Sequence, residues 1–228
     1  MKSLQNVFAA IIVCTALVCV FMLNKSDPPV RAQSCGAGGP TQLGTVVELA
    51  GNCPQGAGAL PNSTCRLLEV RCTGLNPVTV QVRIIEPAAG ITRRGTVVFS
   101  SGASGTGFYE GNSASLFQEL IAKGYRVIDR AWAGPNGWTS NEGGLRKESC
   151  RYATLLTWIR NNIHSGGVFV ASGNSGGSAE VGYALTTWGR GDILDLAVPT
   201  SGPAVARLDY ACPNPIPAEW VSLCSSIV

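Results

Sequence analysis

A glycine-rich pentapeptide at residues 173–177, with the sequence GNSGG, contains the side chain best suited to chemistry in this chain. An apolar run at 168–171 precedes it and is typical of a buried strand. Residues 178–187 follow and have the composition of a helix of small residues. G-x-S-x-G between a strand and a helix holds a serine on a sharp turn, where strain and crowding require neighbours without side chains. The pattern therefore predicts that Ser175 is a nucleophile.

A serine hydroxyl attacks poorly unless a general base takes its proton. The sequence has one histidine, His164, which follows a helix predicted over residues 146–163. A histidine at a helix C-terminus complements the helix dipole, which favours a capping role. It also precedes the strand that leads to Ser175, and so belongs to the opposite edge of the sheet. We therefore do not assign His164 as the base.

Strands and helices alternate along most of the chain. Apolar and β-prone runs predict strands at residues 65–72, 78–85, 95–100, 125–128, 168–171 and 193–198, with a further possible strand at 46–50, and helices at 113–123, 146–163 and 178–187. The first two strands form an antiparallel hairpin. The later alternation indicates an α/β fold: a mostly parallel sheet with helices on both faces and the hairpin as an antiparallel edge.

The pentapeptide, its place in this order of elements and the segment 97–105 (VVFSSGASG) together resemble the α/β-hydrolase family over residues 65–205. The resemblance implies an ancestral serine hydrolase that acts on ester or related acyl bonds. It implies Ser175 as nucleophile and an oxyanion hole made by the backbone amides of Gly176 and Ala103. Family members usually add two or more strands after the one predicted at 193–198, and these carry the acid and the histidine. We therefore interpret the hydrolase-like domain as incomplete at its C-terminus, with a missing segment supplied in trans as one option.

Three carboxylates come into question around the predicted site. Asp209 follows the last predicted strand and is the candidate acid, with a solvated loop position as the alternative. Glu180 is expected to face solvent or to pair locally, and Asp129 to line a pocket. Trp132 and Trp138 either present aromatic surface to a substrate or pack under a loop.

The glycines at 102, 105 and 107 follow a strand and precede a helix, which is also where phosphate groups bind. Their spacing fits neither the dinucleotide fingerprint nor the P-loop. No cofactor is therefore expected. A metal site is not expected either, since the exported part of the chain contains no C-x-x-C pair and no cluster of histidine and cysteine.

Residues 1–32 read as a secretory signal, with Lys2 before an apolar run at 7–23 and cleavage near 30–32. The alternative is an uncleaved membrane anchor, the one case in which a membrane partner is expected. Either way, the body of the protein is secreted or periplasmic. It divides into a Gly/Pro-rich arm at 33–63 and the truncated hydrolase-like domain at 64–228.

Without residues 1–32, the formal charge falls from +3 to +1, with 14 basic and 13 acidic residues. This balance excludes the basic stripe that a nucleic-acid partner needs. An exported chain favours disulfides, and the cysteines that remain are Cys35, Cys53, Cys65, Cys72, Cys150, Cys212 and Cys224. Cys212 is expected to pair with Cys224, and Cys53 with either Cys65 or Cys72. An odd number leaves one thiol without a partner in the chain.

Two functions follow from the sequence. The first is a serine hydrolase for a small-molecule acyl or ester substrate, weak or inactive in this chain because no triad histidine is present. The second is a binding module that has kept the hydrolase scaffold without its catalysis.

Overall fold

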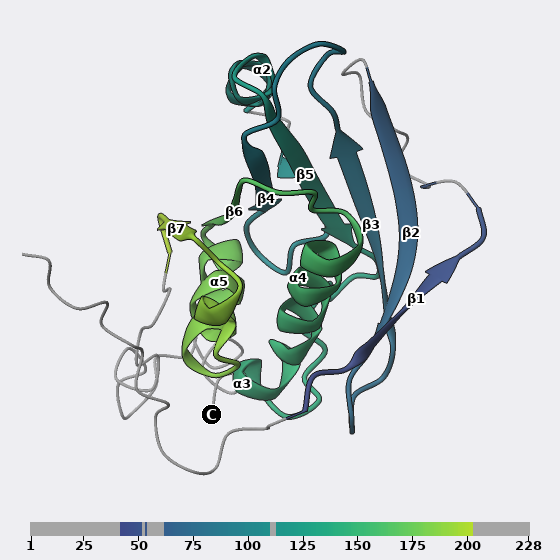
Figure 1. Ribbon diagram of the computed structural model, residues 1–228. Coiled ribbons are helices and arrows are strands. Elements are labelled where there is room, and N and C mark those ends of the chain that lie inside the picture. The colour runs from purple at the N-terminus through teal and green to yellow at the C-terminus, as the bar shows by residue number, and fades with distance from the viewer. Residues whose placement is uncertain (1–41, 52, 54–61, 110–112, 203–228) are drawn as a thin grey trace, which may run out of the picture. The chain divides into compact units, whose positions relative to one another are not determined.

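The computed structural model describes residues 42–51, 53, 62–109 and 113–202, all within the unit Cys35–Val228 (Figure 1). These residues form a sheet with the strand order β1-β2-β3-β5-β4-β6-β7. Its strands are β1 (Thr45–Leu49), β2 (Ser63–Arg71), β3 (Val78–Ile85), β4 (Gly95–Ser100), β5 (Tyr125–Trp132), β6 (Val168–Asn174) and β7 (Leu196–Thr200). The helices are α2 (Ala114–Ala122), α3 (Leu145–Glu148), α4 (Cys150–Asn162) and α5 (Gly176–Thr186).

The sheet changes from antiparallel to parallel between β3 and β5. Strands β1, β2 and β3 pair in antiparallel fashion, and β3 pairs antiparallel with β5. Strands β5, β4, β6 and β7 are parallel to one another. The predicted fold class, a mostly parallel α/β sheet with an antiparallel N-terminal hairpin, is confirmed. The possible strand at residues 46–50 is observed as β1, which pairs with β2 at the outer edge.

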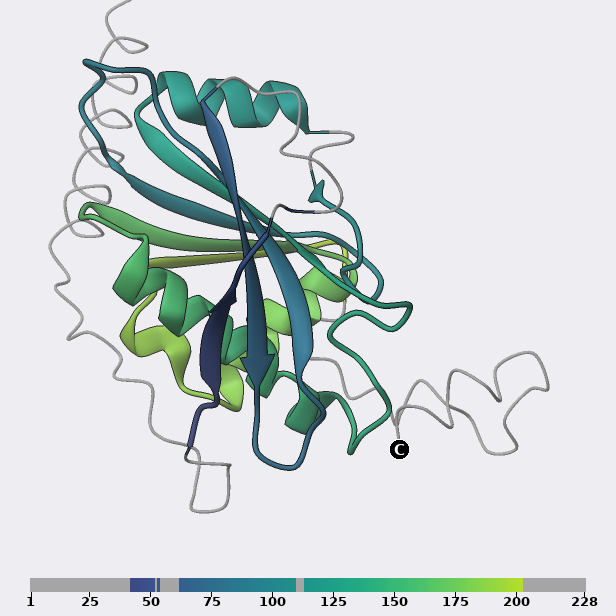
Figure 2. The ribbon, with the colours of Figure 1, turned by 90° about the vertical axis from the view of Figure 1, so that its right-hand side faces the viewer.

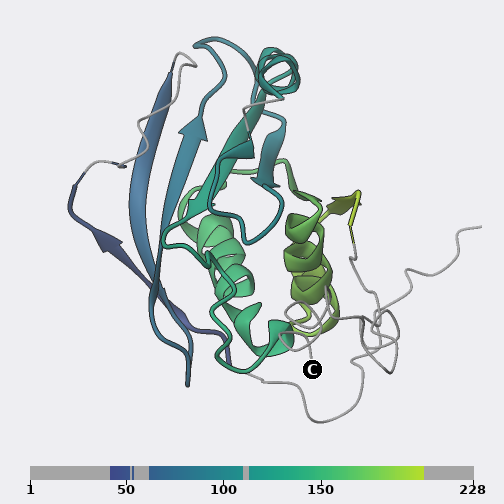
Figure 3. The same cartoon turned by 180° about the vertical axis from the view of Figure 1, so that it is seen from behind.

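Helices cover both faces of the parallel strands, as Figure 2 shows for α2 on one side and for α4 and α5 on the other. The reason is visible in β4, where every residue is buried and successive side chains point to opposite faces. Val97 and Phe99 pack with Phe117 of α2. Val98 belongs to the second cluster, which lies under α4 and α5. These two helices lie side by side on their face (Figures 1 and 3).

Several predicted elements have different bounds in the structure, among them one helix and the last strand. The helix predicted over residues 146–163 is divided at Ser149, whose hydroxyl donates to the carbonyl oxygen of Arg146 and accepts a hydrogen bond from the indole of Trp188. A serine that bonds its own backbone competes with the helix. The last strand begins at Leu196 rather than at 193, after a short 3₁₀ turn at Arg190–Asp192.

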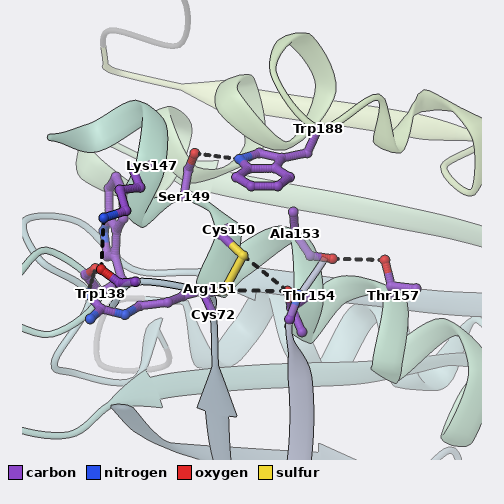
Figure 4. The surroundings of a disulfide bond; sticks show 12 residues. Cys72, Trp138, Lys147, Ser149, Cys150, Arg151, Ala153, Thr154, Thr157 and Trp188 are labelled. Atoms are coloured by element: carbon purple, nitrogen blue, oxygen red, sulfur yellow. Dashed lines mark hydrogen bonds between the residues drawn. A yellow bond between two sulfur atoms is a disulfide. The ribbon is translucent and has the colours of Figure 1, made fainter. Parts of the chain in front are cut away.

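Two disulfides join described residues. Cys53 is bonded to Cys65, which confirms the first of the two predicted partners for Cys53. The alternative partner was wrong, because Cys72 is bonded to Cys150 instead, with their Cα atoms 6.3 Å apart (Figure 4). This second bond ties the segment after β2 to the first residue of α4. The predicted pair Cys212–Cys224 lies outside the described residues.

No helix among the described residues is long and apolar enough to cross a membrane. The predicted signal segment 1–32 and its boundary with the arm lie outside those residues.

Candidate active site

Ser175 occupies the turn between β6 and α5, at the carboxyl end of the parallel strands. Its backbone dihedrals are φ 52° and ψ −118°, a region that non-glycine residues rarely adopt. Such a conformation costs about 1–3 kcal/mol and persists only where the surrounding structure enforces it. The surrounding structure therefore holds the backbone of Ser175 in a conformation that a serine rarely adopts.

The glycines of the pentapeptide are required by close backbone contacts. A Cβ atom on Gly173 would overlap the carbonyl oxygen of Gly177, and one on Gly177 would overlap that of Ser100. A Cβ on Gly176 would overlap the carbonyl oxygen of Ala103. The predicted need for residues without side chains is thus explained at each of the three positions.

The loop after β4 lies directly against this turn. A Cβ atom built on Gly102 would be 3.1 Å from Ser175 Cβ and 3.7 Å from its Oγ. Ala103 has a positive φ of 51°, and its backbone nitrogen would be 3.0 Å from a Cβ on Gly176. Within the described part of the chain, neither the Ala103 amide nor the Gly176 amide donates a hydrogen bond. Two backbone donors thus lie side by side next to the serine.

A strained serine that follows a central parallel strand and opens a helix, with a glycine-containing loop of the neighbouring strand beside it, is the nucleophile-elbow arrangement. The order of the mixed sheet and its antiparallel strand β3 fit the same architecture. The sheet order and the turn at Ser175 are those of an α/β-hydrolase-like fold.

Solved structures similar to this chain include several esterases. Est1E from Butyrivibrio proteoclasticus matches with a TM-score of 0.47 and 14% identity, over 64% of this chain and 55% of that chain. Brefeldin A esterase, described as a bacterial homologue of human hormone-sensitive lipase, matches with a TM-score of 0.44 and 18% identity, over 72% and 47%. A thermostable carboxyl esterase from Bacillus coagulans matches with a TM-score of 0.42 and 18% identity, over 58% and 43%. The chain spans about half the length of these structures. No protein-family model and no curated protein matches the sequence.

The position of Glu180 corrects the expectation that it faces solvent or pairs locally. It is fully buried on the inner side of α5, where its carboxylate accepts hydrogen bonds from Arg130 and from the indole of Trp132, both on β5. Burial raises the pKa of Glu180 to about 7, against the opposing effect of the Arg130 charge. The small residues of α5 allow the helix to approach the sheet closely enough for this contact.

Asp129 does not line a pocket, so that expectation was wrong as well. Its side chain is fully buried between Arg83 Nη2, at 2.7 Å, and the backbone amide of Tyr109, at 2.8 Å. Burial raises the pKa of Asp129 to about 6. Trp132 and Trp138 are each 1% exposed, so of the two alternatives the packed one is observed for both.

His164 and Ser175 lie at opposite ends of the parallel strands. Its Nδ1 is 3.0 Å from the hydroxyl of Thr96, the second residue of β4, whereas Ser175 follows the far end of the adjacent parallel strand. The backbone amide of His164, not its ring, bonds the end of α4, at the carbonyl oxygen of Ile159. The predicted position is thus observed, with the capping made by the main chain. The candidate acid Asp209 lies outside the described residues.

Arg130 is a residue of the site that the sequence did not reveal. It is fully buried next to the elbow helix and donates to carbonyl oxygens of the loop that carries Ala103. An arginine inside an otherwise apolar strand, next to Asp129, is the sequence signal that could have identified it.

The described residues contain no group of three or more His, Cys, Asp or Glu side chains that could bind a metal. The loop with glycines at 102, 105 and 107 has its carbonyl oxygens at 102, 104, 105 and 107 bonded within the protein. A cavity of about 480 Å³ lies elsewhere, beside Cys150 and Trp188.

Proposed function

We propose that the chain carries the nucleophile and the oxyanion hole of a serine hydrolase for small carboxylic esters. Ser175 is the nucleophile, and the backbone amides of Gly176 and Ala103 donate hydrogen bonds to the oxyanion. The observation that carries this proposal is the strained backbone of Ser175 beside two amides without acceptors among the described residues. Strain of this kind is retained where function depends on it.

In the proposed reaction, Ser175 Oγ attacks the ester carbonyl carbon and forms a tetrahedral intermediate. Its oxyanion is stabilised by the two amides, and loss of one such donor typically costs about 3–4 kcal/mol. Collapse of the intermediate releases the alcohol and leaves an acyl-serine, which water then hydrolyses. Each half of the reaction also needs a base and an acid for the proton.

The proton transfer sets the expected rate. His164 lies near the amino ends of the parallel strands, whereas Ser175 lies at their carboxyl ends. The carboxylates of Glu180 and Asp129 are paired with buried arginines. We therefore expect this chain alone to be a poor hydrolase. The oxyanion hole and substrate binding can still leave about 10³–10⁴-fold catalysis over water.

The test is acylation of Ser175 by p-nitrophenyl acetate, located by peptide mapping, with and without imidazole as an external base. We expect slow acetylation of Ser175 that imidazole accelerates, and no modification of this peptide in Ser175→Ala. His164→Gln should acylate at the wild-type rate. Absence of acetyl-Ser175 under both conditions, in folded protein, would refute the proposal.

A binding module on the same scaffold is the second candidate function, favoured by the distance of His164 from the elbow. It predicts that the folded chain binds small esters without acylation, and that Ser175→Ala leaves this binding unchanged. Calorimetric titration with a non-hydrolysable ester analogue, next to the acylation assay, separates the two functions.

We also propose that the protein is exported, as the apolar segment 7–23 predicts. The two disulfides between described residues support this, because such bonds persist in oxidising compartments. Sequencing of the mature N-terminus tests the expected cleavage near residues 30–32. An intact Met1 in a membrane fraction would instead indicate the anchor.

A further inference from the structure

Arg130 joins two parts of the candidate site that are far apart in the sequence. Its guanidinium donates from Nη1 to the carbonyl oxygen of Gly105, at 2.8 Å, and from Nη2 towards that of Ser101, at 3.4 Å. The two carbonyls stand at the two ends of the segment 101–105, which contains Ala103. One side chain of β5 therefore contacts both ends of this loop.

Glu180 holds the same guanidinium from the other side. Its carboxylate accepts from Arg130 Nη2 and, at 2.6 Å, from Trp132 Nε1. Both charged side chains are fully buried, and Glu180 belongs to the helix that begins at the elbow. Charge-assisted bonds of this kind are short and directional, so the pair links helix α5 to the loop through a defined geometry.

The loop is shaped to receive this arginine. A Cβ atom on Gly105 would overlap Arg130 Nη1, and the φ of Gly105 is +73°. Backbone amides add to the same pattern: Trp132 donates to the carbonyl of Gly105 at 2.8 Å, and Trp138 donates to that of Ser104 at 3.1 Å. With its carbonyls bound in this way, the loop keeps the Ala103 amide beside Gly176.

We propose that Arg130, oriented by Glu180, is a positioning residue that fixes the Ala103 amide at the elbow. The role in catalysis rests on the proposed function of Ser175. The effect on the loop does not, and it can be measured in a chain with no activity at all.

The decisive variant is the double substitution Arg130→Met/Glu180→Leu. Replacement of both partners of a buried ion pair by apolar side chains is often tolerated, whereas removal of one leaves a buried charge without compensation. Arg130→Lys keeps the charge but not the fork that reaches two carbonyls. The matched control is Arg83→Met/Asp129→Leu, which removes the other buried ion pair of β5.

The first measurement is amide hydrogen exchange of residues 101–105, read separately from Tyr109, because the control variant removes the acceptor of the Tyr109 amide. We expect exchange of this loop to rise by about tenfold or more in the double variant and less in Arg130→Lys, with the sheet strands unchanged. The control pair should leave residues 101–105 at the wild-type rate. Unchanged loop exchange in a folded double variant would overturn the proposal, and if that variant does not fold, unchanged exchange in Arg130→Lys would do so.

The second measurement is the imidazole-assisted acylation of Ser175. A displaced oxyanion donor should lower the maximal acylation rate by about 10- to 100-fold while the half-saturating ester concentration changes little. Partial recovery in Arg130→Lys is expected. A wild-type chain that does not acylate would refute the function of Ser175. A double variant that acylates like the wild type would refute the role of Arg130 and leave the function of Ser175 standing.

Discussion

The backbone amide of Ser175 donates a hydrogen bond to the carbonyl oxygen of Thr200, at an N···O distance of 2.9 Å. Thr200 ends β7, so the neighbouring parallel strand holds the serine from the side opposite to the Ala103 loop. The hydroxyls of Thr200 and Ser178 both bond the carbonyl oxygen of Gly173, at 3.0 and 2.9 Å. The strained conformation of the elbow is thus enforced by two strands and one helix together.

The strain itself is measurable through Ser175→Gly. Glycine adopts the positive φ without steric cost, which should release about 1–3 kcal/mol, and it loses about 0.5–1 kcal/mol through the entropy of the unfolded chain. We expect Ser175→Gly to be more stable than Ser175→Ala, which keeps the Cβ atom, by roughly 1 kcal/mol. Urea unfolding of the two variants gives this difference directly. Equal stability, or the reverse order, would show that the elbow is not strained.

The glycine at 177 should tolerate no side chain. Its Cβ would overlap the carbonyl oxygen of Ser100 in the next strand, where no flexible side chain can move away. We expect Gly177→Ala to lower the free energy of unfolding by about 1–3 kcal/mol or more, since backbone itself must shift.

The matched control is Gly107→Ala, because a Cβ there meets no atom within 4 Å and its φ is not positive. It should unfold within about 0.5 kcal/mol of the wild type. Similar losses in both variants would mean that the cost is general to glycine replacement in this region and not specific to the elbow.

What the sequence predicted well is local. The elbow was predicted because three glycines around a serine, between a strand and a helix, form a pattern of a few residues. The contacts that require two of these glycines, with Ser100 and Ala103, are not local. The bounds of β3 were predicted to the residue, because its apolar run ends at turn residues on both sides. The predicted end of β5 at residue 128 fell short of Trp132, because Asp129 and Arg130 interrupt the apolar pattern although both are buried.

What the sequence missed is long-range pairing. Glu180 was expected to face solvent or to pair locally, whereas its partner Arg130 lies 50 positions away in the sequence. The partner of Cys72 was missed for the same reason, since Cys150 is 78 positions away. Pairings at such separation depend on the packing of α4 and α5 on the sheet, which no local pattern specifies.

The pKa of His164 is directly observable, because the sequence has one histidine and tag-free protein gives one set of imidazole resonances. Burial lowers this pKa, and the charges of Arg160 and Arg126 lower it further, against the attraction of Asp195. NMR titration should give a value below the ordinary 6.5. A value at or above 6.5 would contradict the observed environment.

The same shift has a consequence for stability. A histidine with a lowered pKa binds fewer protons in the folded than in the unfolded chain, so its contribution is present above pH 6.5 and is lost as the pH falls through the folded-state pKa. As the pH falls from 7 to about 5, the free energy of unfolding of the wild type should therefore decrease relative to that of His164→Gln. Parallel pH profiles of the two proteins would exclude this linkage.

The two disulfides should contribute unequally to stability. Cys72 and Cys150 are separated by 78 residues, whereas Cys53 and Cys65 are separated by 12. A longer closed loop removes more entropy from the unfolded chain, which gives about 4–5 kcal/mol for the first bond and about 3 kcal/mol for the second. Cys72→Ala/Cys150→Ala should accordingly unfold at lower urea than Cys53→Ala/Cys65→Ala.

The bond between Cys72 and Cys150 also anchors α4 beside Thr154, whose hydroxyl is 3.7 and 3.6 Å from the two sulfurs (Figure 4). Its loss should therefore increase hydrogen exchange at the start of α4, and a double variant that leaves exchange there unchanged would show that packing alone holds the helix.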